Sequence, residues 1–153
     1  MTLQKDGFKT LVTIAGISAV FEEIGVTPPA LDAGGSIDQT TMRNTRWRTA
    51  QGKSLITLGN FSVRVAYAAK AYAQIVPILG SNRFITVTFP DNSTLTFYAI
   101  IDKFTPDESV EGERPEATIE FIPSNLTTAN PPAESAPVFA TGTTTTTTTT
   151  ALP

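Results

Sequence analysis

Two stretches of alternating apolar and polar residues, joined by a turn sequence, constrain the fold of this chain most strongly. Ile85, Val87 and Phe89 alternate with threonines up to the sequence PDNS at residues 90–93. After this turn the apolar positions are Leu95, Phe97, Ala99 and Ile101. A period of two is typical of a strand with one face in a core, and Pro, Asp, Asn and Ser favour turns. Residues 85–101 are therefore predicted to form a β-hairpin.

Three further segments alternate in the same way and predict strands. The first runs from Leu11 to Ile24 with Gly16 as a bulge or a point of close approach, and the prolines at 28 and 29 end it because proline cannot donate to a strand ladder. The second strand places Phe61, Val63, Val65 and Tyr67 on one side. The third places Ala117, Ile119 and Phe121 on one side. The chain is therefore predicted to be mainly β.

Residues 68–79 change to a helical period and predict one short α-helix. The apolar stripe of this helix consists of Ala68, Tyr72, Ile75, Val76 and Leu79. Several alanines favour the helical conformation. Pro77 lacks a backbone donor, so the helix is expected to end or kink there, with Gly80 closing the turn. A helix of this length needs to pack against a sheet to be stable.

The segment from Leu31 to Leu58 fits neither period. It begins with the pair Gly34-Gly35 and contains three arginines, several threonines and the only tryptophan of the chain. Because it has too few periodic apolar residues to bury itself, residues 33–54 are predicted to be an arm whose partner is another molecule. Trp and Arg are enriched in protein interfaces, and single-stranded nucleic acids also bind to aromatic rings and arginines. Both interpretations of the arm remain open at this point.

The charges of the chain are segregated along the sequence, although the net charge is only −3. Residues 39–90 contain seven bases and no acid, whereas residues 91–153 contain nine acids and two bases. Four of these nine acids are in an acidic loop, PDESVEGERP, at residues 106–115. Such segregation favours contacts between copies of the chain, with a basic region of one against an acidic region of the next.

The composition excludes the common catalytic arrangements. The chain has no histidine and no cysteine, so the usual triads, thiolate metal sites and disulfides are impossible. Glu22 and Glu23 are adjacent on a predicted strand and should point to opposite faces. The acids of the 106–115 loop lack the spacing of a calcium loop, and no stretch approaches transmembrane length. We therefore expect no enzyme activity, no catalytic residue, no cofactor and no metal.

After Leu126 the composition changes to Thr, Ala, Pro and Gly and ends in eight consecutive threonines at 143–150. This segment cannot bury enough apolar surface to fold alone. The sequence is therefore divided into a β domain over residues 1–126 and a Thr/Pro/Ala-rich C-terminal extension over residues 127–153. Val138 and Phe139 are the expected anchors of the extension.

The order of these features resembles the major tail tube proteins of long-tailed, siphovirus-like bacteriophages. The resemblance covers residues 8–126. Its segments, in chain order, are IAGIS, VTPPALDAGGSIDQTTMRNTRWRT, KSLITLGNFSVRVAY, AAKAYAQIVPILGSN, ITVTFPDNSTLTFYAII and EATIEFIPSN. The second and third of these segments lead into and out of the arm, and the fourth is the predicted helix.

The resemblance implies a β-sandwich or partial barrel with one flanking helix and a long arm between strands. It implies subunits that form hexameric rings, which stack into a hollow tail tube. Double-stranded DNA would pass through the lumen to the host without specific binding, and tail terminator and tail-tip proteins would be further partners. The protein would be in the virion tail after assembly in the host cytoplasm. The inner tube of a contractile injection system is the first alternative, and a small nucleic-acid-binding β-barrel is the second.

In the tube proteins the long loop reaches the neighbouring ring, and residues 33–54 match that loop here. The expected assembly residues are Arg43, Arg46, Trp47, Arg48 and Lys53 in the arm and Asp107, Glu108, Glu111 and Glu113 in the acidic loop. The arginines of one copy would then meet the carboxylates of another. Because DNA has to slide, acids and hydroxyls rather than cations are expected on the lumen wall.

Overall fold

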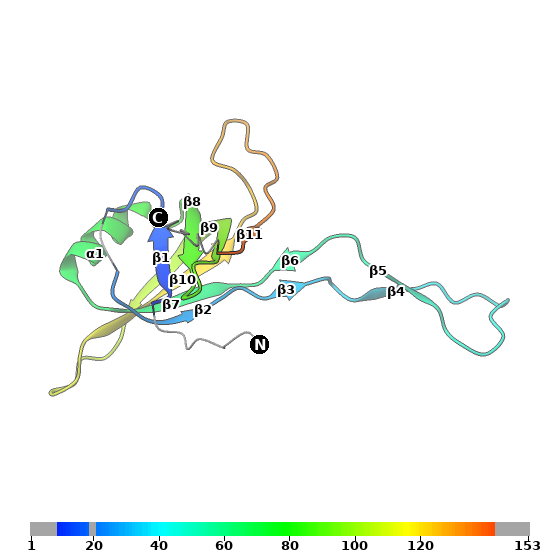
Figure 1. Ribbon diagram of the computed structural model, residues 1–153, viewed down its shortest axis with the longest axis horizontal. Coiled ribbons are helices and arrows are strands. Elements are labelled where there is room, and N and C mark those ends of the chain that lie inside the picture. Colours follow the sequence, from blue (N-terminus) through cyan, green and yellow to red (C-terminus); the bar gives the residue numbers. More distant parts are fainter. Residues whose placement is uncertain (1–8, 19–20, 143–153) are drawn as a thin grey trace, which may run out of the picture.

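The computed structural model describes residues 9–18 and 21–142 (Figure 1). The threonine run at 143–150 lies outside the described residues. The strands are β1 (Leu11–Ile14), β2 (Glu23–Thr27), β3 (Leu31–Asp32), β4 (Ser36–Asp38), β5 (Ala50–Gly52), β6 (Thr57–Leu58), β7 (Phe61–Ala66), β8 (Asn82–Thr88), β9 (Thr94–Pro106), β10 (Glu116–Pro123) and β11 (Val138–Ala140). The helix α1 (Ala69–Ile75) continues into the 3₁₀ turn η1 (Val76–Ile78). The prediction of a mainly β chain with one short helix is confirmed.

Seven strands form one antiparallel sheet in the order β1-β8-β9-β10-β7-β2, with β11 paired to β9. The predicted hairpin is β8–β9, in which Ile85 lies opposite Phe97 and Thr86 lies opposite Thr96. Its turn is closed by the Phe89 N–H, which donates to the Ser93 carbonyl at 2.9 Å. The apolar and the threonine positions of the two strands therefore occupy opposite faces of the sheet.

One face of the sheet carries the hydrophobic core, which α1 also contacts. The most completely buried large side chains are Phe61, Phe121, Ile14, Ile75, Ile85, Ile101, Ile119, Val63, Val65 and Val87. The Phe61 ring is edge-on to Phe97, with ring centroids 5.5 Å apart, and lies 5.2 Å from the ring of Phe121. Apart from Ile75, which belongs to α1, these residues lie in the predicted strands, so the period of two identified the strand positions of the core correctly.

The sheet is curled, but it is not a closed barrel. β1 and β2 are the outermost strands, and Glu23 of β2 accepts a hydrogen bond from the Val12 N–H of β1 at 2.8 Å (Oε1 to N). This side-chain contact joins strands from opposite ends of the sheet. No backbone ladder joins β1 to β2 among the residues that the structure describes. The partial-barrel form of the predicted fold is the one observed.

The predicted continuous strand over residues 11–24 is wrong. β1 ends at Ile14, the Ile17 N–H donates to the Ile14 carbonyl at 3.2 Å, and Gly16 has a φ of +86°. A left-handed φ is accessible to glycine at little cost, so Gly16 turns the chain out of the sheet instead of forming a bulge within it. The next strand is β2, at the opposite end of the sheet from β1. It ends at Thr27, immediately before the prolines, as expected.

The helix ends where Pro77 was expected to end it, but its buried stripe differs from the prediction. Only Ala71 and Ile75 of α1 are buried, whereas Tyr72, Val76 and Leu79 are exposed. The backbone tightens into η1 at Val76, just before Pro77. The tighter turn rotates the following side chains away from the face that contacts the sheet.

Three segments project from this body (Figure 1). The arm extends to one side as the strands β3 to β6, and the acidic loop between β9 and β10 extends to the other side. The third is the loop between β10 and β11, in which the Ser135 N–H donates to the Asn125 carbonyl at 2.8 Å. Its return strand β11 contains Val138 and Phe139, which contribute to the sheet through the β9 ladder while their side chains remain exposed.

Candidate assembly interface

The arm is an extended hairpin that continues the paired strands β2 and β7 beyond the sheet. Its shaft consists of two short ladders, β3 with β6 and β4 with β5. Gly34 and Gly35 lie between the ladders with φ values of +76° and +82°, a conformation that few other residues adopt. The Gly34 N–H donates to the Asp32 carboxylate at 2.7 Å. The glycine pair therefore joins the two ladders into one arm.

The tip of the arm, residues 39–49, is held by hydrogen bonds within this short segment. The Asn44 side-chain oxygen accepts from the Thr41 N–H at 2.8 Å, and its side-chain nitrogen donates to the Trp47 carbonyl at 2.8 Å. The Gln39 N–H donates to the Thr49 carbonyl at 2.8 Å. These local bonds shape the tip without any buried apolar residue, so its side chains are displayed rather than packed.

The predicted arm residues are on this displayed surface. Arg43, Arg46, Arg48 and Lys53 are all exposed, and the Trp47 side chain is 76 % exposed. The Arg46 guanidinium lies 5.7 Å from the centroid of the Trp47 ring, within the range of a cation–π contact. An exposed tryptophan beside arginines is the composition of an interface anchor.

Asp38, at the outer end of β4, organises the approach to the tip. Its Oδ1 accepts hydrogen bonds from the Thr40 hydroxyl at 2.5 Å and from the Thr40 N–H at 2.8 Å. Both bonds favour the charged carboxylate and so lower the pKa of Asp38 from its ordinary value, and the bond from the Thr40 hydroxyl has the larger effect. The other carboxylate oxygen lies 3.7 Å from Arg48, in a solvent-exposed pair that contributes little to stability.

The predicted acidic partners are at the tip of the β9–β10 hairpin. Asp107, Glu108, Glu111 and Glu113 are exposed, and none of them forms a salt bridge with a described residue. At the base of this loop Glu116 pairs with both Arg64 and Arg114. A hollow of about 410 Å³ lies between this ion-paired base and three of the loop acids, Asp107, Glu108 and Glu113. The loop therefore presents unpaired negative charge.

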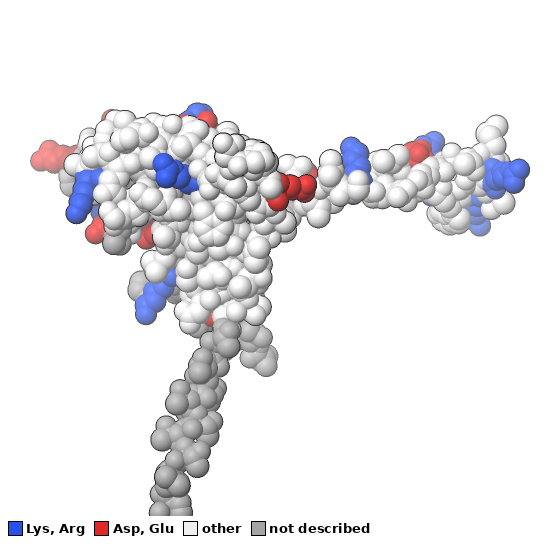
Figure 2. All heavy atoms as spheres, turned by 90° about the horizontal axis from the view of Figure 1, so that it is seen from above, with Lys and Arg blue, Asp and Glu red and all other residues white. Residues whose placement is uncertain are grey.

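The structure does not bring the basic and acidic residues together within one chain. The arm tip and the acidic loop lie at opposite ends of the molecule along its longest axis (Figure 1). Figure 2 shows Lys and Arg at the outer end of the arm and Asp and Glu at the far extreme of the body, where some basic residues also lie. The two groups can meet only between different copies of the chain.

A groove at the root of the arm was missed by the sequence analysis. It has a volume of about 360 Å³, and its lining residues are Leu31, Ser54, Leu55, Ile56, Leu58, Asn125, Glu134, Ser135, Ala136 and Pro137. Leu55 and Ile56 are 81 % and 66 % exposed. One wall belongs to the arm and the other to the β10–β11 loop. No local pattern signals such a site, because its walls are about eighty residues apart in the sequence.

Asn125, in the wall of this root groove, has an unsatisfied side chain. Its Oδ1 atom is buried and has no hydrogen-bond partner among the described residues. Leaving a buried acceptor unpaired costs about 1–3 kcal/mol. The groove therefore combines apolar side chains with one acceptor that lacks a donor.

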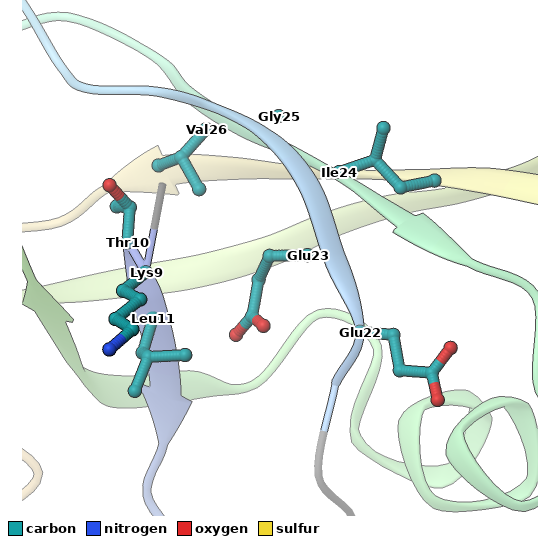
Figure 3. Close-up of a pocket in the computed structure, with 8 residues that line it drawn as sticks. All are labelled: Lys9, Thr10, Leu11, Glu22, Glu23, Ile24, Gly25 and Val26. Carbon is teal, nitrogen blue, oxygen red and sulfur yellow. The ribbon is translucent and has the colours of Figure 1, made fainter. Parts of the chain in front are cut away.

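A hollow of about 610 Å³ lies at the opening between β1 and β2 and shows no catalytic pairing (Figure 3). Glu23 points toward Leu11, whereas Glu22 points away from it. This divergence confirms that the adjacent carboxylates are on opposite sides. Glu23 is already engaged with the Val12 N–H, which gives it a structural role.

Two searches of the described residues concern other kinds of site. Across residues 9–18 and 21–142, no cluster of three or more Asp or Glu side chains is arranged to hold a metal ion. Within the same ranges, no helix has the length and apolar character needed to cross a membrane.

Comparison with known proteins adds information on the fold. No model of a protein family matches the chain, and no curated protein matches it in sequence. A chain from the anti-feeding prophage (AFP) baseplate, a six-fold symmetrised cryo-EM structure, matches with a TM-score of 0.63 and 10 % identity over 92 % of this chain and 98 % of that one. A chain from the tail of an empty GTA particle with C6 symmetry matches with a TM-score of 0.55 and 15 % identity, covering 90 % and 99 %.

These matches show that the chain shares its fold with subunits of two six-fold symmetric particles. The alignments span nearly the whole length of both neighbours, so the arm and the sheet belong to one architecture. At 10 and 15 % identity the likeness concerns the fold alone.

Proposed function

We propose that this protein is a structural subunit of a phage tail that assembles into stacked hexameric rings around a hollow tube. The observation that carries the proposal is the shared fold, over more than nine tenths of each neighbour, with chains of a baseplate and a tail that have six-fold symmetry. Closing six curled sheets into a ring would cover the edge strands β1 and β2 that one copy leaves open. The assembled protein would be in the virion tail, after assembly in the host cytoplasm.

The arm is proposed to connect one ring to the next. Its basic side chains, Arg43, Arg46, Arg48 and Lys53, would contact the acidic loop of a copy in the neighbouring ring, where Asp107, Glu108, Glu111 and Glu113 are unpaired. Their placement at opposite ends of the long axis supports a head-to-tail contact. Ordering exposed side chains at the contact costs conformational entropy, so assembly should depend on protein concentration.

The channel is proposed to be lined by the sheet face opposite the core. This face carries hydroxyls at Ser62, Thr86, Thr88, Thr94, Thr96 and Thr118. Its cations are neutralised, because Arg64 pairs with Glu116 and Lys103 lies 3.8 Å from Glu120. Few free cations would leave double-stranded DNA able to slide. Tail terminator and tail-tip proteins would cap the ends of the tube.

A second candidate is the inner tube of a contractile injection system. The match to the AFP baseplate chain, which has the higher of the two TM-scores, favours it. Both candidates use the same ring and the same arm and differ in whether a sheath surrounds the tube. The third candidate from the sequence, a nucleic-acid-binding barrel that uses Arg43, Arg46 and Trp47, requires no contact between copies.

Charge reversal in the arm tests the proposal. The variants Arg46→Glu and Arg48→Glu should remain folded, because both side chains are exposed, and should fail to form tubes, because like charges would then face the acidic loop. Negative-stain microscopy over a concentration series provides the measurement. Lys70→Glu, a reversal at an exposed position on α1, is the matched control and should assemble normally.

Two results would reject the assembly role. Tubes of normal length from Arg46→Glu and Arg48→Glu would remove the arm from the ring-to-ring contact. A chain that stays monomeric at every concentration, and binds single-stranded DNA with an affinity that falls steeply with salt, would instead establish the nucleic-acid candidate.

A further inference from the structure

We propose that the root groove is the binding site for Trp47 from the arm tip of another copy of this chain. The inference rests on the proposed function, in that it assumes contacts between copies. It goes beyond that function by assigning a receptor that lies outside the acidic loop. Each copy would then carry the ligand at the tip of its arm and the receptor at the root.

A copy cannot fill its own root groove. Trp47 precedes Leu55 by eight residues, and the intervening chain runs along the shaft of the hairpin. At about 3.3 Å per extended residue, the chain between them spans at most roughly 25 Å, and the paired shaft holds the tip away from the root (Figure 1). The occupant is therefore a second molecule.

The size and surface of the groove suit one large aromatic side chain. A volume of about 360 Å³ is at the small end of the range for ligand pockets, roughly 300–1,000 Å³. Its most exposed walls are the aliphatic side chains Leu31, Leu55 and Ile56. Trp47 is the largest exposed apolar side chain of the described chain, and burying a tryptophan removes about 150–250 Å² from water. Both surfaces lack a partner in the single copy.

The polar groups of the two surfaces are also complementary. The indole N–H is a donor only, and that of Trp47 has no hydrogen-bond partner among the described residues. Asn125 has a buried side-chain oxygen, an acceptor, to which no group donates a hydrogen bond. Because Asn125 lines the groove, the proposed contact requires its amide to turn so that this oxygen meets the indole N–H. The contact would therefore satisfy two groups that one copy leaves unsatisfied.

The charges near the groove and near Trp47 are also complementary. Glu134 is the only charged residue that lines the root groove, and it forms no salt bridge within the described chain. Arg46 lies over the Trp47 ring and would enter with it. The root groove and the acidic loop would then belong to two different copies, and one arm tip would contact both.

The single tryptophan of the chain allows a direct test. Its fluorescence, measured before and after assembly of the full chain, should shift to shorter wavelength and become protected from acrylamide quenching. Ile56→Asp places a charge in the groove at an exposed position, so the monomer should stay folded by circular dichroism. We expect this variant to lose the protection and to need on the order of tenfold more protein to assemble, the loss typical of a removed anchor contact.

The control is Val76→Asp, the same kind of change at an exposed apolar residue on η1, outside the groove. It should assemble with Trp47 protected as in the native chain. Tubes in which Trp47 stays fully quenchable would overturn the groove assignment while leaving the proposed function intact. Protection that survives in Ile56→Asp but disappears in Val76→Asp would place Trp47 elsewhere and overturn it equally. A chain that never assembles would reject the proposed function and, with it, this inference.

Discussion

The body of this molecule buries its large apolar side chains, whereas the arm leaves them exposed to solvent. In the body, Phe61, Phe97 and Phe121 meet in one buried cluster. In the arm, Met42 and Trp47 are exposed, and the order of the tip comes from hydrogen bonds of Asn44 and Thr40 with near neighbours. The body is thus stabilised by contacts between distant strands, whereas the arm is shaped locally.

This difference separates folding from assembly. Burial of apolar surface contributes about 25 cal/mol per Å² to stability. In the body, this burial takes place within one chain and stabilises the monomer. The apolar surface of the arm and its root remains available for a second molecule. A change in the body should therefore alter the stability of the monomer, and a change in the arm should alter only association. The predictions below test this division.

The largest effect is expected from a truncation in the body. Phe61→Ala removes a ring that is fully buried against Phe97 and Phe121, which should lower the free energy of unfolding by about 3–5 kcal/mol. Chemical denaturation followed by circular dichroism measures the change. Met42→Ala, in the arm, is the matched control and should leave the free energy within about 0.5 kcal/mol of the native value. Equal losses in the two variants would contradict the division.

A shortened arm should give the converse result. Asp38 lies opposite Ala50 in the β4–β5 ladder, so residues 39–49 can be replaced by Asn-Gly, which favours a two-residue hairpin turn. The body should keep its free energy of unfolding within about 1 kcal/mol, because the removed residues bond only to one another and to Asp38 and Gln51 of the arm. Tubes should be absent by negative-stain microscopy. A chain that unfolds on shortening would mean that the arm supports the body.

The sequence predicted the body well because its signal is local and repeated. The period of two located β7, β8, β9 and β10 and their buried faces. The same signal failed at Gly16, where a backbone conformation rather than side-chain polarity ends β1. It also misplaced part of the helical stripe, because η1 departs from the α-helical period at Val76.

The sequence predicted the charged parts of the candidate site but not the root groove. Composition identified the basic arm and the acidic loop, because charge segregation is visible without knowing the fold. The root groove was not identified, since Leu55 and Ile56 acquire their opposite wall from residues 134–137 only after the β10–β11 loop has folded back.

The smallest expected effect concerns the pH dependence of the arm tip. Hydrogen bonds from Thr40 lower the pKa of Asp38 below 3.8, so the bonded tip is favoured above the pKa of the unfolded chain and is lost as the pH falls through the lower folded value. NMR titration of the Thr40 amide should therefore show a midpoint below 3.8. Thr40→Val removes the hydroxyl donor and should move this midpoint upward. The core should not respond, because Asp38 is exposed and distant from it. A midpoint that is unchanged in Thr40→Val would show that another group, such as Arg48, holds the carboxylate in its charged form.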